Sequence, residues 1–295
     1  MVYDTICLSS GGLYGISFIG ALDYLVEEKI IDLNNIKNFV GTSIGSIVLY
    51  LIIVGYTIKE INNIIIKLDF SKIQTETNIE YVLKDFGINN GTKIILLLNF
   101  FLKKKLNIDD ITFNELYVKY KKNFIVIATN LTKGKESIFS YKNTPDMSII
   151  TAVRISTSIP IIFTPVLYNN EYYVDGALTN MFPINYCNQE TTISLNLPFC
   201  DSYTTNNILD VLLNSLKIAA KTISIKNELK ILDNIINIYC KSNSSFDLNI
   251  TLETKIDLIN IGRKSAIEHI NNSNLHIKIL CLDILNIIID NIITH

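Results

Sequence analysis

The first 54 residues repeat one pattern twice: a short apolar run, a turn rich in glycine and serine, and an apolar stretch with helical spacing. The first copy covers residues 5–8, 9–12 and 16–28, and the second covers residues 38–40, 41–46 and 47–54. Short buried strands that alternate with helices are typical of a mostly parallel sheet with helices on both faces. This alternation predicts an α/β protein.

The rest of the chain extends the same architecture. Further apolar runs predict strands at residues 124–129, 137–141, 172–174 and 191–195. Residues 206–239 carry apolar side chains mostly at three- and four-residue steps, which predicts helices, and residues 242–245 form a polar loop. No linker rich in Pro, Gly and Ser separates two domains. We therefore expect one domain over residues 1–295, with a core at about 5–197 and a helical completion at about 206–295.

One stretch could be mistaken for a membrane helix, because residues 38–58 contain no charged side chain. Two glycines and three hydroxyl residues, however, lie within residues 41–46. What remains, residues 47–54 before Gly55, has the length of a short buried helix with a glycine C-cap. We predict a strand, a tight turn and a core helix there.

Charge and cysteine content exclude several classes of function. Lys and Arg number 26 against 28 Asp and Glu, so the net charge of -2 offers no general attraction for nucleic-acid phosphates. The five cysteines form no C-x-x-C pair, which gives no support for a zinc site and predicts buried, reduced thiols. The N-terminus has no basic region of the secretory type. We expect a cytoplasmic protein, with delivery into a host cell as another route, that needs no metal and no cofactor.

Two glycine turns are the strongest candidates for chemistry. Residues 41–45 read G-x-S-x-G between a predicted strand and a predicted helix, the context in which Ser43 acts as a nucleophile on a strained turn; an ordinary glycine-serine turn is the alternative. Residues 10–15 form a second glycine turn, but its spacing fits neither the dinucleotide fingerprint nor the phosphate loop. Its backbone amides could instead stabilise an oxyanion if the turn lies beside Ser43.

A serine nucleophile needs a base, and the position of the histidines leaves two choices. His269, His276 and His295 lie within the last 27 positions, and no histidine precedes them. A triad would use His269 or His276 in the chain order of α/β-hydrolases, although only two strands precede Ser43, which is fewer than in that fold. Alternatively, Asp175 takes the proton directly, because a predicted strand leads into it and Gly176 permits a tight turn after it.

Four motifs together resemble those of the patatin-like phospholipases. They are the glycine loop with Gly11, Gly12, Leu13 and Gly15; the elbow with Gly41, Ser43 and Gly45; the serine-rich turn at residues 155–160; and Asp175, Gly176 and Ala177, followed by Asn180 and Pro183. The resemblance covers about two-thirds of the chain. It implies a three-layer fold with a mostly parallel central sheet flanked by helices.

The resemblance also implies an activity and a mechanism. Similar proteins are lipid acyl hydrolases of the phospholipase A type, with a Ser-Asp dyad and no histidine. Ser43 would be the nucleophile and Asp175 its base, while the amides of Gly11, Gly12 and Leu13 would line the oxyanion hole. The implied partners are an acyl-ester lipid, a membrane surface contacted peripherally and, in some cases, an activating protein.

This chain departs from the family pattern at three positions. Ser10 stands where the family's loop usually begins with a glycine, Tyr14 stands where a basic residue is usual, and Ala177 replaces a second glycine after Asp175. Because of the first two changes, a catalytically silent lipid-binding or interaction protein is the alternative from another functional class.

Two further features have competing interpretations. Residues 94–102 are almost wholly apolar, and three lysines follow at 103–105. A core helix that ends in lysines matched to its dipole is favoured over a lid facing an anionic lipid surface. Arg154 is predicted to have a structural ion pair, with contact to a lipid head group as the alternative.

Overall fold

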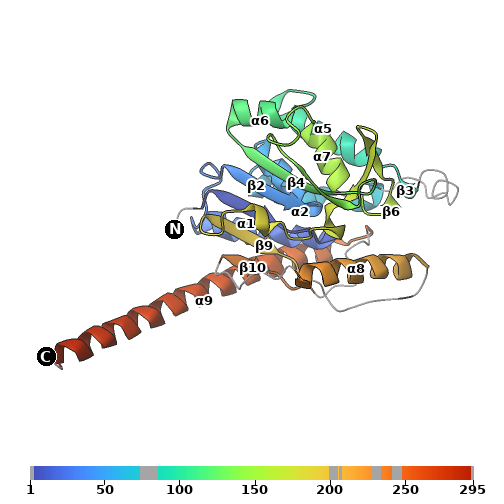
Figure 1. The fold of residues 1–295 in the computed structure, drawn as a ribbon. Coiled ribbons are helices and arrows are strands. Elements are labelled where there is room, and N and C mark those ends of the chain that lie inside the picture. The colour runs from blue at the N-terminus through green and yellow to red at the C-terminus, as the bar shows by residue number, and fades with distance from the viewer. Residues whose placement is uncertain are drawn as a thin grey trace.

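The computed structural model describes residues 3–73, 86–198, 205, 208–226, 234–240 and 248–293; for 208–209, 224–226 and 274–293 the description covers the backbone. Within them, an eight-stranded sheet has the order β10-β9-β1-β2-β4-β8-β7, with β5 paired to β4 (Figure 1). The strands are β1 (Thr5–Leu8), β2 (Asn38–Thr42), β4 (Asn123–Asn130), β5 (Lys135–Phe139), β7 (Val166–Tyr168), β8 (Glu171–Asp175), β9 (Thr192–Asn196) and β10 (Ile235–Asn237). A separate ribbon pairs β3 (Gly87–Asn89) with β6 (Ile161–Phe163).

The central strands run parallel, as the alternating sequence pattern predicts. β10, β9, β1, β2 and β4 pair in parallel, whereas β5, β8 and β7 add antiparallel hairpins at one side. The α-helices are α1 (Ser17–Glu27), α2 (Ile44–Ile53), α3 (Ile58–Lys67), α5 (Thr92–Leu106), α6 (Phe113–Tyr120), α7 (Ile149–Ser156), α8 (Ile208–Lys226) and α9 (Leu252–Ile293). Short 3-10 helices are η1 (Gly12–Ile16), η2 (Phe70–Ile73), η3 (Gly176–Leu178) and η4 (Ile184–Tyr186).

Successive side chains of the central strands point to opposite faces of the sheet and belong to two different buried clusters. Ile6 and Leu8 of β1 belong to the large core shared with α1, α2, α3, α5 and α7. Cys7 and Val40 point to the other face, where they form a smaller cluster with Ile184 of η4. α8 contacts η3. The predicted α/β fold with a central sheet flanked by helices is therefore confirmed.

α9 is fixed to the domain where it crosses α1, and its C-terminal part extends away from the sheet (Figure 1). Both helices have a glycine at the crossing. A methyl group on Gly20 would lie 1.8 Å from the carbonyl oxygen of Ile259, and one on Gly262 would lie 1.7 Å from that of Ser17. The absence of side chains at these two positions lets the helix backbones touch.

The sequence prediction is wrong at residues 235–237, which were expected to be helical. They form β10, parallel to β9 at the edge of the sheet, and Ile236 is buried in the core. Isoleucines fit a strand at least as well as a helix, and a three-residue segment is too short for its spacing to distinguish the two. The loop expected at 242–245 lies outside the described residues.

The uncharged stretch at residues 38–58 folds as β2, the turn at Ser43 and α2, as predicted. Among the helices that the structure describes, none has the length and apolar character required to cross a bilayer. A single domain over residues 1–295 stays a prediction from the sequence.

Candidate active site

Ser43 occupies a strained turn between β2 and α2. Its backbone has φ +53° and ψ −123°, a conformation that a residue with a side chain rarely adopts. The turn is tight because Gly45 lies against β1, where a methyl group would be 2.5 Å from the carbonyl oxygen of Leu8. Gly41 is similarly crowded by Leu49 and the amide of Ser46. These contacts explain the G-x-S-x-G spacing.

A second serine, Ser156 at the end of α7, holds the turn in place. Its hydroxyl accepts a hydrogen bond from the Ser43 amide at 2.9 Å and donates one to the carbonyl of Ile127 at 2.6 Å. Ser156 is fully buried. The Ser43 amide is therefore occupied within the fold, and oxyanion donors must come from elsewhere.

Asp175, the last residue of β8, faces Ser43. The Ser43 hydroxyl donates to Oδ2 of Asp175 at 2.5 Å, and the Ala177 amide donates to Oδ1 at 2.8 Å. The backbone of Asp175 is held as well, because its amide donates to the Ser158 carbonyl at 2.9 Å and its carbonyl accepts from the Thr129 hydroxyl at 2.9 Å. These hydrogen bonds hold both carboxylate oxygens and the backbone of Asp175, so that its side chain faces Ser43.

Burial raises the pKa of Asp175 to about 7, and the hydrogen bonds from the Ser43 hydroxyl and the Ala177 amide oppose this rise only in part. The side chain is almost completely buried. A carboxylate with a pKa near neutrality is a better proton acceptor than an exposed aspartate.

The glycine loop of η1 lies at the same end of the sheet. Gly12 has φ +57°, a left-handed conformation that favours glycine, and Gly15 packs so closely on Ile44 that a methyl group would be 2.4 Å from its Cγ1 atom. Within the described part of the chain, the amides of Gly11, Gly12 and Leu13 have no backbone acceptor.

The two departures in this loop are accommodated by the fold. Ser10 is buried, and its amide donates to the Met181 carbonyl at 2.8 Å, which ties the loop to the segment after Asp175. The carbonyl of Tyr14 accepts a hydrogen bond from the Ser17 hydroxyl at the start of α1. Gly176 also sits in a tight place, since a methyl group there would be 2.3 Å from the carbonyl oxygen of Ile127.

Ser43, Gly12 and Leu13 line one cavity of about 170 Å³. Its other walls are isoleucine, leucine, valine and phenylalanine side chains from α2, α3, α5, η2 and β6. Among the described residues that line it, the only polar side chains are Ser43 and Thr157. The cavity can therefore hold a hydrocarbon chain with one end at the serine.

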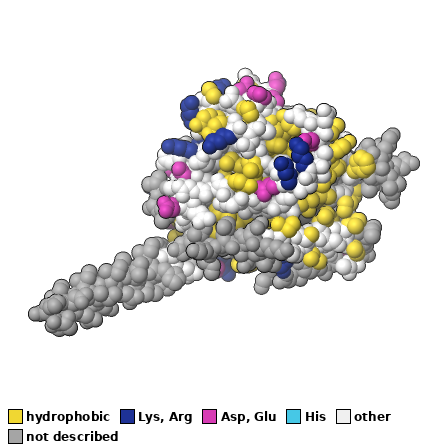
Figure 2. Space-filling model, in the orientation of Figure 1, with side chains coloured by type: hydrophobic (Ala, Val, Ile, Leu, Met, Phe, Trp, Pro, Cys, Tyr) yellow, Lys and Arg dark blue, Asp and Glu magenta, His cyan; other side chains and the backbone are white. Residues whose placement is uncertain are grey.

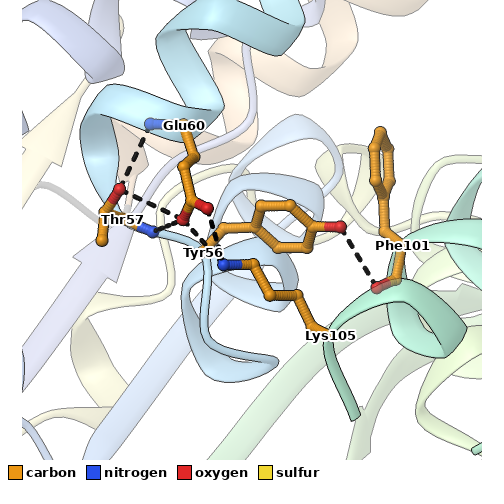
Figure 3. Close-up of polar contacts among 5 residues, drawn as sticks. All are labelled: Tyr56, Thr57, Glu60, Phe101 and Lys105. Carbon is orange, nitrogen blue, oxygen red and sulfur yellow. Dashed lines mark hydrogen bonds and ion pairs between the residues drawn. The ribbon is translucent and has the colours of Figure 1, made fainter. Parts of the chain in front are cut away.

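A polar clamp joins two of the helices that form the cavity wall (Figure 3). Lys105 of α5 pairs with Glu60 of α3 at 2.8 Å, and Tyr56 donates to the Phe101 carbonyl at 3.3 Å. Glu60 also completes a capping box with Thr57 at the start of α3. Hydrogen bonds from Lys105 and Thr57 lower the pKa of Glu60 to about 2.

The predicted helix over residues 94–102 is present as α5, and it does more than fill the core. Ile94, Leu98 and Phe101 face the cavity, so this helix is part of the candidate site. Of the three lysines after it, Lys105 belongs to the clamp and Lys103 pairs with Asp109 at 2.6 Å.

The ion pair predicted for Arg154 is absent from the described residues. Arg154 is buried and donates to the carbonyls of Asn90 and Thr164, at 3.0 and 3.3 Å, and to the Ser158 hydroxyl. Burial lowers its pKa to about 10. Carbonyl dipoles and the face of Phe163 replace a carboxylate. The sequence could not show this, because Asn90 lies 64 positions from Arg154 and the Thr164 carbonyl comes close only through the turn after α7.

The structure does not bring the described histidine to Ser43. His269 lies on α9, two turns beyond the crossing at Gly262, and it does not line the cavity. His276 is on the same helix with its side chain outside the described residues, and His295 is outside them altogether. Asp175 alone, among the described titratable groups, bonds to the Ser43 hydroxyl.

The sequence marked the serine-rich turn with Ser156 and Ser158 but assigned these residues no role, and it did not single out Thr129. The clustering of the two serines was a signal, but their partners come from β4 and β8. Thr129 is one hydroxyl residue in an apolar strand, and nothing local distinguishes it.

Comparison with known proteins shows what this chain is similar to. The patatin-like phospholipase family matches residues 6–187. "Probable lipid hydrolase 463L" of Invertebrate iridescent virus 6 is 38% identical over 186 residues, which span 62% of each chain. An uncharacterized protein, R571, of Acanthamoeba polyphaga mimivirus is 31% identical over 281 residues, spanning 90% of this chain and 93% of its own.

A solved structure shows the same fold. VipD from Legionella pneumophila matches with a TM-score of 0.60 at 19% identity, over 92% of this chain and 67% of its own. Since the family match extends over more than half of the sequence, this chain belongs to the patatin-like phospholipase family.

Proposed function

We propose that this protein is a serine lipid acyl hydrolase of the phospholipase A type, with Ser43 and Asp175 as its catalytic dyad. Membership in the family and the similarity to a viral probable lipid hydrolase support a lipid acyl hydrolase. The assignment of Ser43 and Asp175 as the dyad rests on the hydrogen bond from Ser43 to the buried Asp175, which forms beside an apolar cavity.

The geometry supports a two-step mechanism. Asp175 Oδ2 accepts the Ser43 proton as Oγ attacks the ester carbonyl, and the amides of Gly11, Gly12 and Leu13 stabilise the oxyanion. The proton passes to the leaving alcohol or lysolipid, which leaves an acyl group on Ser43. Water then attacks the acyl-enzyme, with Asp175 again accepting the proton. As the bond to Ser43 breaks, Asp175 returns this proton to Ser43 Oγ and the fatty acid is released. These steps require no metal or cofactor.

The cavity suits the acyl part of the substrate. A hydrocarbon chain gains stability by leaving water for a wall of aliphatic and phenylalanine side chains, and no charged side chain among the described residues opposes it. The substrate is then a phospholipid or a related acyl ester. We expect a cytoplasmic protein that contacts membranes peripherally, with an activating protein partner as a further expectation.

The proposal is tested by fatty-acid release from mixed phospholipid vesicles. Ser43→Ala and Asp175→Ala are each expected to lower the turnover rate at least about 10³-fold, because one removes the nucleophile and the other its base. Ser215→Ala, an exposed serine on α8, is the matched control and should keep full activity. Activity retained by Ser43→Ala would contradict the dyad.

The outcome also separates the enzyme from a silent lipid-binding protein. If the wild-type chain binds vesicles yet releases no fatty acid from them or from soluble esters, the proposed activity is wrong. The altered loop residues Ser10 and Tyr14 would then be the first positions to restore toward the family pattern.

A further inference from the structure

α5 is apolar on two sides, although a surface helix normally has a polar outer face. One side lines the cavity. The opposite side exposes Leu96 at 61% and Phe100 at 57% of their surface, one helical turn apart. Phe86, just before β3, is exposed at 63%. We name Phe86, Leu96 and Phe100 the apolar rim.

The rim residues belong to elements next to the cavity: Leu96 and Phe100 are on α5, whose other side lines it, and Phe86 precedes β3. Leu97 of α5 lines the cavity next to the exposed Leu96, and β3 pairs with β6, whose Ile162 and Phe163 line it too. The Lys93 ammonium donates to the Lys72 carbonyl at 2.8 Å, which ties α5 to η2 at the same place. Figure 2 shows hydrophobic side chains gathered where β3 and β6 lie in Figure 1.

Cations lie at the end of the rim. Lys104 lies over the Phe100 ring, with its nitrogen 5.8 Å from the ring centroid. Lys103 is exposed beside it, in an ion pair with the exposed Asp109 that an anionic head group can replace. At a membrane surface, the exposed apolar side chains would contact the acyl chains and the lysines would contact the anionic head groups.

The size of the rim favours a lipid surface over a protein partner. Its three side chains expose at most roughly 400 Å², whereas each partner in a standard protein interface buries about 800 Å². Insertion into a bilayer needs only a few apolar side chains and no complementary shape.

We infer that the apolar rim, with Lys103 and Lys104, inserts into an anionic lipid surface and places the cavity against the membrane from which the substrate comes. This inference rests on the proposed function. It assigns two roles to α5: the side that lines the cavity binds the acyl chain, and the opposite, exposed side contacts the membrane.

Binding is measured first, on the Ser43→Ala background so that the vesicles stay intact. With phosphatidylcholine and phosphatidylserine at 4:1, the double variant Leu96→Ser, Phe100→Ser should bind about tenfold more weakly. Val118→Ser is the matched control, because Val118 is equally exposed, at 58%, but lies on the next helix, α6, which does not line the cavity. Equal binding by the rim variant and its parent would overturn the inference.

The lysines are tested separately. Lys103→Gln with Lys104→Gln should weaken binding to the phosphatidylserine vesicles and leave binding to pure phosphatidylcholine unchanged, and added salt should have the same effect on the wild type. Lys119→Gln on α6 is the control. Binding that does not depend on phosphatidylserine would overturn the role of the lysines.

A soluble short-chain ester separates this inference from the proposed function. The rim variants should hydrolyse it like the wild type and lose activity only on vesicles, because no rim side chain lines the cavity. Loss of soluble hydrolysis in Ser43→Ala checks the dyad independently. If the wild type forms dimers that the rim variants do not, the rim is an interface between copies and the lipid assignment is wrong.

Discussion

At the scale of single residues, the proposed base Asp175 leads to a prediction about the pH dependence of the activity. Its pKa of about 7 means that half of the molecules carry the neutral acid at that pH, and the neutral acid cannot accept the Ser43 proton. We expect kcat/KM for a soluble ester to reach a plateau above pH 8 and to fall about tenfold for each pH unit below 6. A rate profile from pH 5 to 9 checks this. A flat profile across pH 5 to 7 would exclude Asp175 as the titrating base.

The same carboxylate is expected to cost stability. Its folded pKa lies above the ordinary value of 3.8, so the folded protein holds the proton more tightly, and this group's contribution to stability is lost as pH rises from 4 through 7. The difference between 3.8 and about 7 corresponds to about 4 kcal/mol. Asp175→Asn should therefore be inactive but more stable than the wild type at pH 8.

Denaturant unfolding of both proteins at pH 5 and pH 8 measures this cost. The gain from Asp175→Asn should be larger at pH 8 than at pH 5, because only the wild type ionises a buried group between them. Asp32→Asn, at an exposed loop residue, should show no such gain. An equal effect at both pH values would mean that the carboxylate is not destabilised by burial.

At the scale of elements, the crossing of α1 and α9 gives the sharpest prediction. Ala is normally better than Gly in a helix by about 1 kcal/mol. At Gly262, however, the added methyl group would collide with the Ser17 carbonyl, so Gly262→Ala should lower the free energy of unfolding by about 1–3 kcal/mol. Denaturant unfolding of the variant and the wild type gives the sign of the change in the free energy of unfolding, which distinguishes a collision from a gain in helix propensity.

Lys264→Ala, at an exposed position two residues further along α9, is the control and should change stability by less than about 0.5 kcal/mol. A stabilising Gly262→Ala would show that the two helices are farther apart than in this structure.

Elements also differ in how far the sequence predicts them. β1, β2, β4 and their helices follow from strong periodicity and glycine turns, because a buried strand has few alternatives. β10 did not, since a three-residue segment with two isoleucines becomes a strand only when β9 offers it a free edge. α5 was correctly predicted as a helix. The sequence did not show which of its apolar side chains line the cavity and which are exposed, because this depends on the elements packed against it.

At the scale of the whole molecule, catalysis should not depend on histidine. The described His269 sits on the helix that leaves the domain, far along the chain from the strands that hold Ser43 and Asp175. Replacing His269, His276 and His295 together by Ala is expected to keep activity on a soluble ester within about twofold, because the proposed base is Asp175 and not a histidine. A loss comparable with that of Ser43→Ala would favour the triad.

The sequence by itself determined the α/β class and the positions of the glycine loop, the G-x-S-x-G turn and the turn after Asp175, because each depends on a few neighbouring residues whose backbone must turn sharply. It left the base open between Asp175 and a histidine, and only the resemblance to a family favoured Asp175. Only the tertiary structure decided what surrounds them. The hydrogen bond from Ser43 to Asp175 joins residues 132 positions apart, and Ser156 reaches the elbow across 113 positions. Burial that raises the pKa of Asp175, and the apolar cavity, exist only after distant segments pack and exclude water.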